Sequence, residues 1–459
     1  MRMWIPITMF ALTVLLTGCM TRQLTSDIDK YVKAAGPETP PETMPAMPSP
    51  EEELKGLSGD RILDGYVNLA LLRNPAVNAA KGRWLAARAR AVSESYPEDP
   101  TATYGRFVKE FDQRRNASFM QQIPTPPKLH LRGRAASEEA AAMEQEYMAV
   151  ALDVATNVKT TFHELFYIKR AIDVTNENRE ILKNVITIAQ AQLRAGKATG
   201  QDVLKAQVEL DKTDSDLLML QQQWETMRAD FNALRYLPPS AEVTMPEKVE
   251  ISETVPDPEA LYPEALKRRP EILQANAAVR QSDVILSLAR LKRLPDLTLG
   301  IDWMQMLAMP ANSTHSALDL SFGFNLPIWL NKLKAQEYES RALKAAAIWQ
   351  RDSVVSNALS QIKSTHYKYI TAKKLEALYA ESLVPHAEQA RELAETGYKA
   401  SKVGVLDLLD SQRTLLMFRL AQLRATTDRY QRLAELERAV GKSLTAGATS
   451  PDKTSGEGK

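Results

Sequence analysis

The two halves of this sequence repeat one another, so the fold must be built from two similar units. The segment ALLRNP at 70–75 returns as ALKRRP at 265–270, a shift of 195 residues. The segment AGKATGQDVLKAQ at 195–207 returns as ASKVGVLDLLDSQ at 400–412, a shift of 205 residues, so the copies differ by an insertion. A chain of 459 residues also exceeds the size of one ordinary hydrophobic core. The sequence therefore predicts a tandem duplication.

Proline-rich stretches border the two repeats. One lies at 36–50, with six prolines in fifteen residues, and a second lies at 237–258. Such composition favours extended chain without a core of its own. We therefore predict a signal peptide at 1–18, a lipidated N-terminus and linker at 19–58, a first repeat at 59–238, a linker at 239–258, a second repeat at 259–443, and a disordered tail at 444–459.

The first nineteen residues have the order of a bacterial export signal. Arg2 supplies a basic start, an apolar run follows at 4–16, and the sequence L-T-G-C ends at Cys19. A run of about 13 residues is too short to span about 30 Å of hydrocarbon, which indicates a signal peptide and not a membrane anchor. The L-T-G-C motif resembles a lipobox, so we expect Cys19 to carry lipid; a chance cysteine is the alternative. Because Met20 is not the aspartate that retains lipoproteins at the inner membrane, we expect delivery to the outer membrane.

Each half is predicted to contain two very long helices joined by a tight break. The stretch 135–193 has no proline or glycine, and about 60 helical residues would reach about 90 Å, far beyond an ordinary globular helix. The partner helix has a seven-residue repeat of mainly apolar positions: Val203, Leu210, Leu217, Trp224 and Phe231, with Ala206, Thr213, Leu220, Met227 and Leu234 three positions later. This seam predicts coiled-coil packing. An ordinary amphipathic helix in a globular bundle is the alternative.

Alternating apolar residues in the second half predict a strand, a loop and a second strand. The first strand covers 297–303, the second covers 318–326, and the loop 304–316 would face outward. One apolar face and one small or polar face suit the wall of a transmembrane barrel, with Trp303 and Trp329 in an aromatic girdle. A soluble sandwich has the same alternation. In the first half, charged residues interrupt the corresponding region 101–123 and leave its strand limits open.

Several features together resemble the TolC-type outer-membrane factors over residues 59–443. They are the lipobox, the duplication, the helix starts at Asn74-Pro75 and Arg269-Pro270, the I-P and L-P strand ends, and the two helix breaks. The resemblance implies a mainly α-helical protein with four β-strands per subunit, a homotrimer with a twelve-stranded β-barrel, and an α-helical tunnel through the periplasm. Four strands alone would leave open edges in lipid, which is energetically costly.

The implied function is that of an outer-membrane channel and not of an enzyme. We expect it to receive small molecules from an inner-membrane pump, of the RND type, through a periplasmic membrane-fusion adaptor. A duct for type I protein secretion, and a lipid-anchored coiled-coil scaffold without a pore, are the alternatives. Net charge of +1 gives no reason to expect nucleic acid as a partner.

The resemblance also assigns residues to the periplasmic tips. Asp407 and Asp410 match an acidic entrance ring, where six carboxylates in three copies would favour cations. Tyr398 and Asp202 match a gating hydrogen-bond pair. A second gate contact of the family, between an arginine and a threonine, falls on Val403 and Gln201 and cannot form. The alternative role of the three aspartates is to stabilise helix N-termini through the helix dipole.

Motifs for catalysis or cofactor binding are not found in this sequence. His163-Glu164 is followed by Tyr167 where a zinc-protease motif needs a second histidine. The five histidines lack metal-ligand spacing, and no phosphate-binding glycine loop occurs, so no cofactor is expected. Met304, Met306 and Met309, with His315, are soft-metal ligand types, although such residues more often fill a loop or the bilayer interface.

Overall fold

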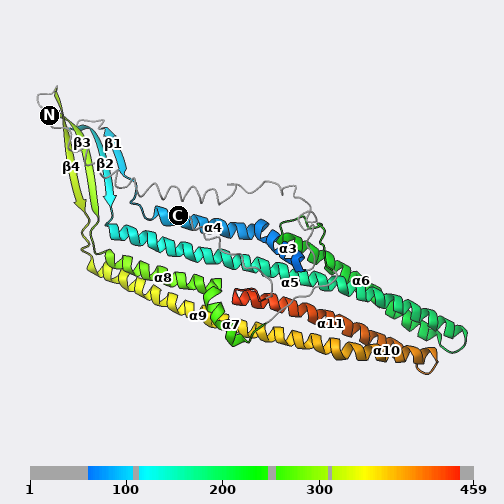
Figure 1. Cartoon of the computed structure of the whole chain (residues 1–459). Helices are drawn as coiled ribbons and strands as arrows, with labels where there is room; N and C mark the ends of the chain where they lie inside the picture. The colour runs from blue at the N-terminus through cyan, green and yellow to red at the C-terminus, as the bar shows by residue number, and fades with distance from the viewer. Residues whose placement is uncertain (1–59, 107–112, 247–254, 309–312, 445–459) are drawn as a thin grey trace. The chain divides into compact units, whose positions relative to one another are not determined.

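The computed structural model describes residues 60–106, 113–246, 255–308 and 313–444 (Figure 1). The predicted signal peptide and Cys19 lie outside these residues. The described residues form two compact units. We call Ala79–Tyr147 with Pro270–Val355 the sheet unit, and residues 60–78, Met148–Arg269 and 356–444 the hairpin unit.

The chain is mainly helical with one small antiparallel sheet, as the sequence predicts. Its elements follow in the order α3 (Asp60–Arg73), α4 (Pro75–Ser93), β1 (Thr101–Arg106), β2 (Gln113–Ile123), α5 (Pro126–Arg194), α6 (Gly200–Leu234), α7 (Pro258–Arg268), α8 (Pro270–Leu291), β3 (Leu297–Ala308), β4 (Ser313–Phe324), α9 (Leu330–Leu378), the π-helical turn η1 (Tyr379–Leu383), α10 (Val384–Lys399) and α11 (Val405–Val440). None of the described helices combines the length and the apolarity that crossing a membrane requires.

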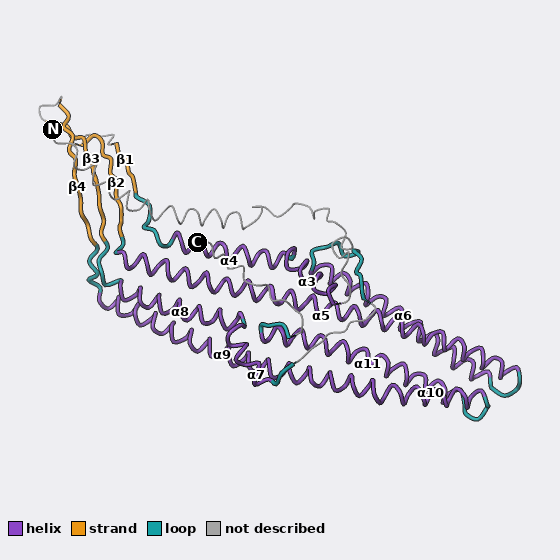
Figure 2. The backbone as a smooth tube through the Cα atoms, in the orientation of Figure 1, coloured by secondary structure: helices purple, strands orange, loops and turns teal. Residues whose placement is uncertain are grey.

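The four strands pair in sequence order and are antiparallel throughout (Figure 2). Ile123 pairs with Leu297, and Leu297 pairs with Phe324, so three strands end at one level. One prediction was wrong: most of the expected loop 304–316 is strand, because the pairing of β3 with β4 continues to Ala308 and Ser313. The connection 309–312, with Met309, lies outside the described residues. In the first half, where the sequence left the strand limits within 101–123 open, the structure has the strands β1 and β2.

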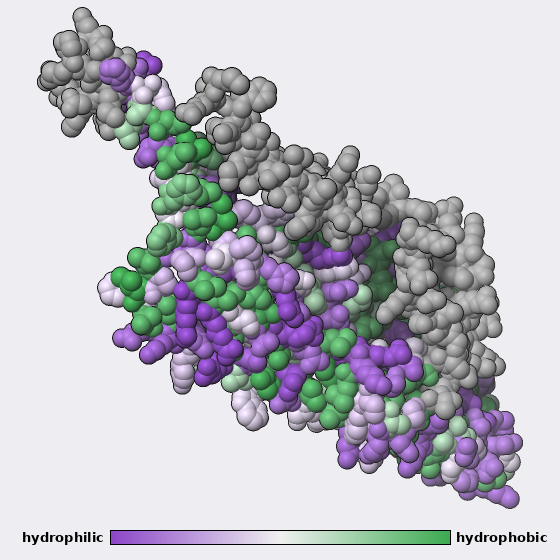
Figure 3. Space-filling model, turned by 60° about the vertical axis from the view of Figure 1, so that its left-hand side comes forward, coloured by the Kyte–Doolittle hydropathy of each residue, from purple (hydrophilic) through white to green (hydrophobic). Residues whose placement is uncertain are grey.

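The sheet has one apolar and one polar face, because side chains alternate along each strand. Leu299 pairs with Phe322 on the apolar face, and Asp302 pairs with Asp319 on the polar face. The apolar side chains of β4 are exposed, with Phe322 at 75% and Leu318 at 68% of full accessibility, and hydrophobic residues cover much of the visible strand surface (Figure 3). Soluble proteins rarely expose such a surface, which indicates a membrane or another protein against this face.

Polar groups around the buried Lys128 tie the strand ends of the sheet unit together. The Lys128 ammonium, on the first turn of α5, donates to the Asp296 carboxylate at 2.9 Å and to the Leu294 carbonyl at 2.6 Å. The same carboxylate accepts the Thr125 N–H at 3.1 Å. The Asp296 N–H donates to the side-chain oxygen of Asn325, directly after β4. We call these four residues, Lys128, Asp296, Thr125 and Asn325, the junction knot.

In the hairpin unit, the seam predicted for α6 is confirmed: each of its ten positions is buried or half-buried. By contrast, apolar residues off the seam, such as Leu204 and Leu218, are exposed. The stretch from α9 through η1 to α10 contains one residue more than α5. The π-turn accommodates this extra residue within a continuous helix. It accounts for one of the ten residues by which the repeat shift grows from 195 to 205.

The residue before each repeated proline binds the last helix of its own repeat. The Asn74 amide donates to the Leu234 carbonyl at 2.9 Å, and the Arg269 guanidinium donates to the Ala439 carbonyl at 3.2 Å. The two carbonyls lie at the C-terminal ends of α6 and α11, where helical carbonyls lack partners within the helix. Both Pro75 and Pro270 begin helices, as predicted. The duplication is therefore visible in contacts as well as in sequence.

Candidate entrance site at the hairpin tips

The two helix breaks predicted as tips lie in the hairpin unit and have the same backbone construction. Gly196 and Ser401, at equivalent repeat positions, both have left-handed φ angles, of 70° and 56°. The Lys197 N–H donates to the Gln192 carbonyl at 2.9 Å, and the Lys402 N–H donates to the Gly397 carbonyl at 2.8 Å. These bonds satisfy carbonyls at the ends of α5 and α10. Both tips therefore turn the chain through the same helix-ending motif.

An aspartate caps the helix that follows each tip. The Asp202 carboxylate accepts the Thr199 N–H and the Thr199 hydroxyl, both at 2.9 Å. The Asp407 carboxylate accepts the Gly404 N–H at 3.1 Å. The backbone N–H of Thr199 holds the pKa of Asp202 below its ordinary value. The alternative role considered for these aspartates, stabilisation of helix N-termini, is therefore present for Asp202 and Asp407.

Tyr398 lies in a hydrophobic cluster that joins the two tips, which we call the tip cluster. Its buried members are Leu182, Val185, Ile186, Ala189, Ala206, Tyr398, Val405, Leu408 and Leu409, and Val403 packs against them. Tyr398 is 3% exposed, and its hydroxyl has no hydrogen-bond partner among the described residues. Burial, and then the charge of Asp202, raise the pKa of Tyr398. The structure thus places Asp202 near Tyr398 without the hydrogen bond, and the gate pair stays a prediction.

The two aspartates of the predicted entrance ring are both exposed on the first turns of α11. They are three residues apart and therefore lie on one helix face. Arg413, one turn further on, forms an ion pair with Glu209 of α6. The hydrogen bond that Arg413 donates to Glu209, and then the charges of Glu209 and Asp410, raise the pKa of Arg413. Gln201 is exposed beside the capped start of α6, and Val403 packs against the tip cluster.

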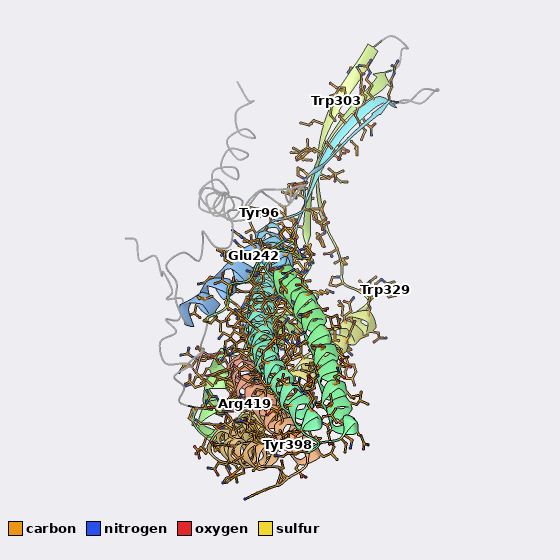
Figure 4. All side chains as sticks on the ribbon, turned by 90° about the vertical axis from the view of Figure 1, so that its right-hand side faces the viewer. Tyr96, Glu242, Trp303, Trp329, Tyr398 and Arg419 are labelled. Atoms are coloured by element: carbon orange, nitrogen blue, oxygen red, sulfur yellow. The ribbon has the colours of Figure 1, made fainter. Side chains whose placement is uncertain are left out.

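A row of charged and polar pairs continues from the tips along α5 and α11, and sequence analysis missed it. Arg424 binds Glu164 at 2.8 Å, Lys159 binds Glu437 at 2.6 Å, and the buried Gln412 amide donates to Asn178 at 2.7 Å. Arg419, which Figure 4 labels, forms ion pairs with Glu177 and Glu388. The arginines along α11 were the available signal. However, the partners of Arg413, Arg419 and Arg424 on α5 and α6 lie more than two hundred residues earlier in the chain, as the separation of 260 for Arg424 illustrates.

The candidate soft-metal residues that the structure describes lie on the two long strands of the sheet. Met304 and His315 lie on the polar face of the sheet, and the backbone of Met306 pairs with that of His315. Within the described ranges, no group of three His, Cys, Asp or Glu side chains is arranged to hold a metal ion.

The chain resembles known proteins over most of its length. It matches the family described as outer membrane efflux protein over residues 66–234 and 261–442. It is 22% identical to the pyoverdine export outer membrane protein OpmQ of Pseudomonas putida over 83% of this chain and 85% of that protein. It is 23% identical to the cobalt-zinc-cadmium resistance protein CzcC of Cupriavidus metallidurans over 63% of this chain and 68% of that protein. The fold matches the outer-membrane channel OprN with a TM-score of 0.71 and 18% identity, over 89% of this chain and 99% of that one.

Proposed function

The chain belongs to the outer membrane efflux protein family, and we propose that three copies of it form a passive exit duct for small molecules delivered by an inner-membrane pump. The observation that carries the proposal is the sheet. It has an exposed apolar face, and among the described residues its outer strands β1 and β4 each pair on one side only. Edge strands in hydrocarbon would leave backbone groups without hydrogen bonds, so a spanning sheet must close. One copy has too few strands to close around a lumen.

The strand order of the sheet suits closure by copies of the same chain. With four antiparallel strands, β1 and β4 run in opposite directions. The β4 strand of one copy therefore meets β1 of the next in an antiparallel pair, and three copies supply about twelve strands. The apolar face with Phe322 would contact lipid, and the polar face with Asp302 and Asp319 would line the water-filled interior.

The hairpin unit forms the periplasmic half of the duct in this proposal. The paired helices continue the bore, and the capped tips meet a periplasmic membrane-fusion adaptor. Lipid on Cys19 would add a membrane anchor. The pump supplies the energy, and the duct carries out no chemical step. One relative is named for pyoverdine export and another for cobalt, zinc and cadmium resistance. In this proposal the pump, and not this chain, therefore selects the cargo.

Charge selectivity tests both the duct and its entrance. The D407N/D410N variant is expected to lose several-fold of the cation preference in planar-bilayer recordings, because three copies lose six carboxylates at one opening. Each Asn keeps the side-chain shape, and the amide oxygen at 407 still accepts the cap hydrogen bond.

The matched control is D211N/D216N, which removes two charges from α6, away from the tips. It is expected to leave the ratio of cation to anion permeability unchanged. Selectivity that survives in D407N/D410N would refute the entrance ring, whereas a purified wild-type protein that forms no conducting pores would refute the duct.

A further inference from the structure

The segment that connects β4 to α9 exposes a continuous apolar surface. Leu326, Ile328, Trp329 and Leu330 are between 61% and 72% exposed. They follow directly on the apolar face of β4, so the lipid-facing surface of the proposed barrel continues past the last strand residue, Phe324. Figure 4 marks Trp329 at this connection, in the sheet unit.

This segment has a defined backbone. The Ile328 N–H donates to the Leu326 carbonyl at 2.9 Å, and the Leu330 N–H donates to the Ile328 carbonyl at 3.0 Å. Asn325, a member of the junction knot, fixes one end, and α9 fixes the other. A shallow groove results, lined by Ile328, Trp329, Leu330, Asn331 and Lys332. The groove is therefore lined by both apolar and polar groups, with a cation at one end.

Positive charge collects beside the groove. Lys332 and Lys334 are exposed at the start of α9, and no ion pair involves either of them in the described part of the chain. The nearest carboxylate on the next turn, Glu337, already binds three arginines: Arg290 at 3.3 Å, Arg293 at 2.6 Å and Arg341 at 3.2 Å. Glu339 is exposed further along the same helix. The surface next to the apolar segment thus offers unpaired ammonium groups.

We propose that this groove binds an anionic glycerophospholipid of the periplasmic leaflet, with its phosphate at Lys332 and its acyl chains along Leu326, Ile328 and Trp329. Lys334, on another side of the same helix turn, adds to the local positive charge. Two features favour this occupant over a soluble one. The groove is continuous with the lipid-facing surface, and an indole beside lysines is typical of the membrane interface. The inference rests on the proposed function, because it requires the sheet to span the outer membrane with the helices on the periplasmic side.

The test compares phosphatidylglycerol with phosphatidylcholine. The full-length protein is reconstituted in nanodiscs of each lipid, and retained lipid is counted by native mass spectrometry after mild detergent release. A lysine near an anionic surface contributes a factor of about five in affinity, so K332Q/K334Q is expected to weaken phosphatidylglycerol retention roughly 25-fold. The control K363Q/K368Q removes the same charge from exposed positions of α9 in the hairpin unit and is expected to retain the lipid.

Three results would overturn the proposal. They are equal retention of both lipids by the wild type, undiminished phosphatidylglycerol on K332Q/K334Q, and loss of the oligomer by K332Q/K334Q in both lipids, which would make the segment a contact between copies. Conductance in phosphatidylcholine bilayers distinguishes failure of the lipid-site proposal from failure of the exit-duct proposal. A protein that conducts without lipid preference disproves only the lipid site, and a protein that never conducts disproves both.

Discussion

Replacing Lys128 by alanine is expected to lower the free energy of unfolding by about 3–5 kcal/mol, because it leaves the charge of Asp296 in a protein interior without its cation. The Lys128 side chain is 6% exposed and that of Asp296 is 14% exposed. The ammonium also satisfies the Leu294 carbonyl. Loss of the junction knot should therefore loosen the ends of β3 and β4. Denaturant unfolding in detergent, followed by tryptophan fluorescence, measures the change.

A matched control is Lys344→Ala, which breaks the solvated pair with Asp283 in the same unit. Exposed pairs contribute about 0–1 kcal/mol, so this variant should unfold almost as the wild type does. The double variant K128M/D296L removes both charges and should recover most of the loss. If K128A and K344A differ by less than about 1 kcal/mol, the junction knot does not stabilise the sheet.

Protonation of His163 is expected to destabilise the hairpin unit as the pH falls, at pH values higher than those at which carboxylates titrate. Burial, and then the charge of Lys159, lower the pKa of His163 to about 3. Because the unfolded chain protonates this residue near pH 6.5 and the folded chain does not, stability is complete above that pH and falls as the pH drops toward 3. Each pH unit below 6.5 corresponds to about 1.4 kcal/mol, so about 2 kcal/mol is lost by pH 5.

The variant His163→Phe is expected to remove this loss. Its ring would keep the stacking on Tyr430, whose centroid lies 5.1 Å from that of His163, and would not titrate. The exposed His386 provides the control, since H386F should keep the pH dependence of the wild type. Unfolding free energies at pH 7 and pH 5 decide the matter, and a wild type equally stable at both values would exclude this role for His163.

The long helices and their breaks were predictable from sequence because their signals are local. The seam of α6 needs only a seven-residue period, and the tips need only glycine and small residues between long helix-forming stretches. The end of β3 was not predictable in the same way. Met304 and Gln305 carry no turn signal, and the alternation that identifies a strand does not state where pairing stops. Pairing with the partner strand extended β3 to Ala308.

The candidate entrance site was only partly predictable, because an aspartate at a helix start can cap the helix, contribute to an acidic ring, or do both. An aspartate three residues into a helix suits both a cap and an acidic ring, and sequence does not separate the roles for Asp407. The junction knot gave no signal at all. Lys128 and Asp296 are separated by 168 residues, and each alone resembles an ordinary surface charge. Only the fold brings them into one buried contact.

Disulfide trapping between β1 and β4 tests most directly whether three copies close one barrel. Strands lie about 4.8 Å apart, so β1 and β4 of one chain are separated by about 14 Å, which is too far for a disulfide within a copy. Thr103→Cys is combined in turn with cysteine at Ala317, Asp319, Ser321 or Gly323, all on the polar face, and the chain with only Cys19 is the control. We expect at least one combination to give, after oxidation in outer membranes, a covalent product that ends at the trimer. A ladder that continues beyond three copies, or no crosslink in any combination, would contradict the closed barrel.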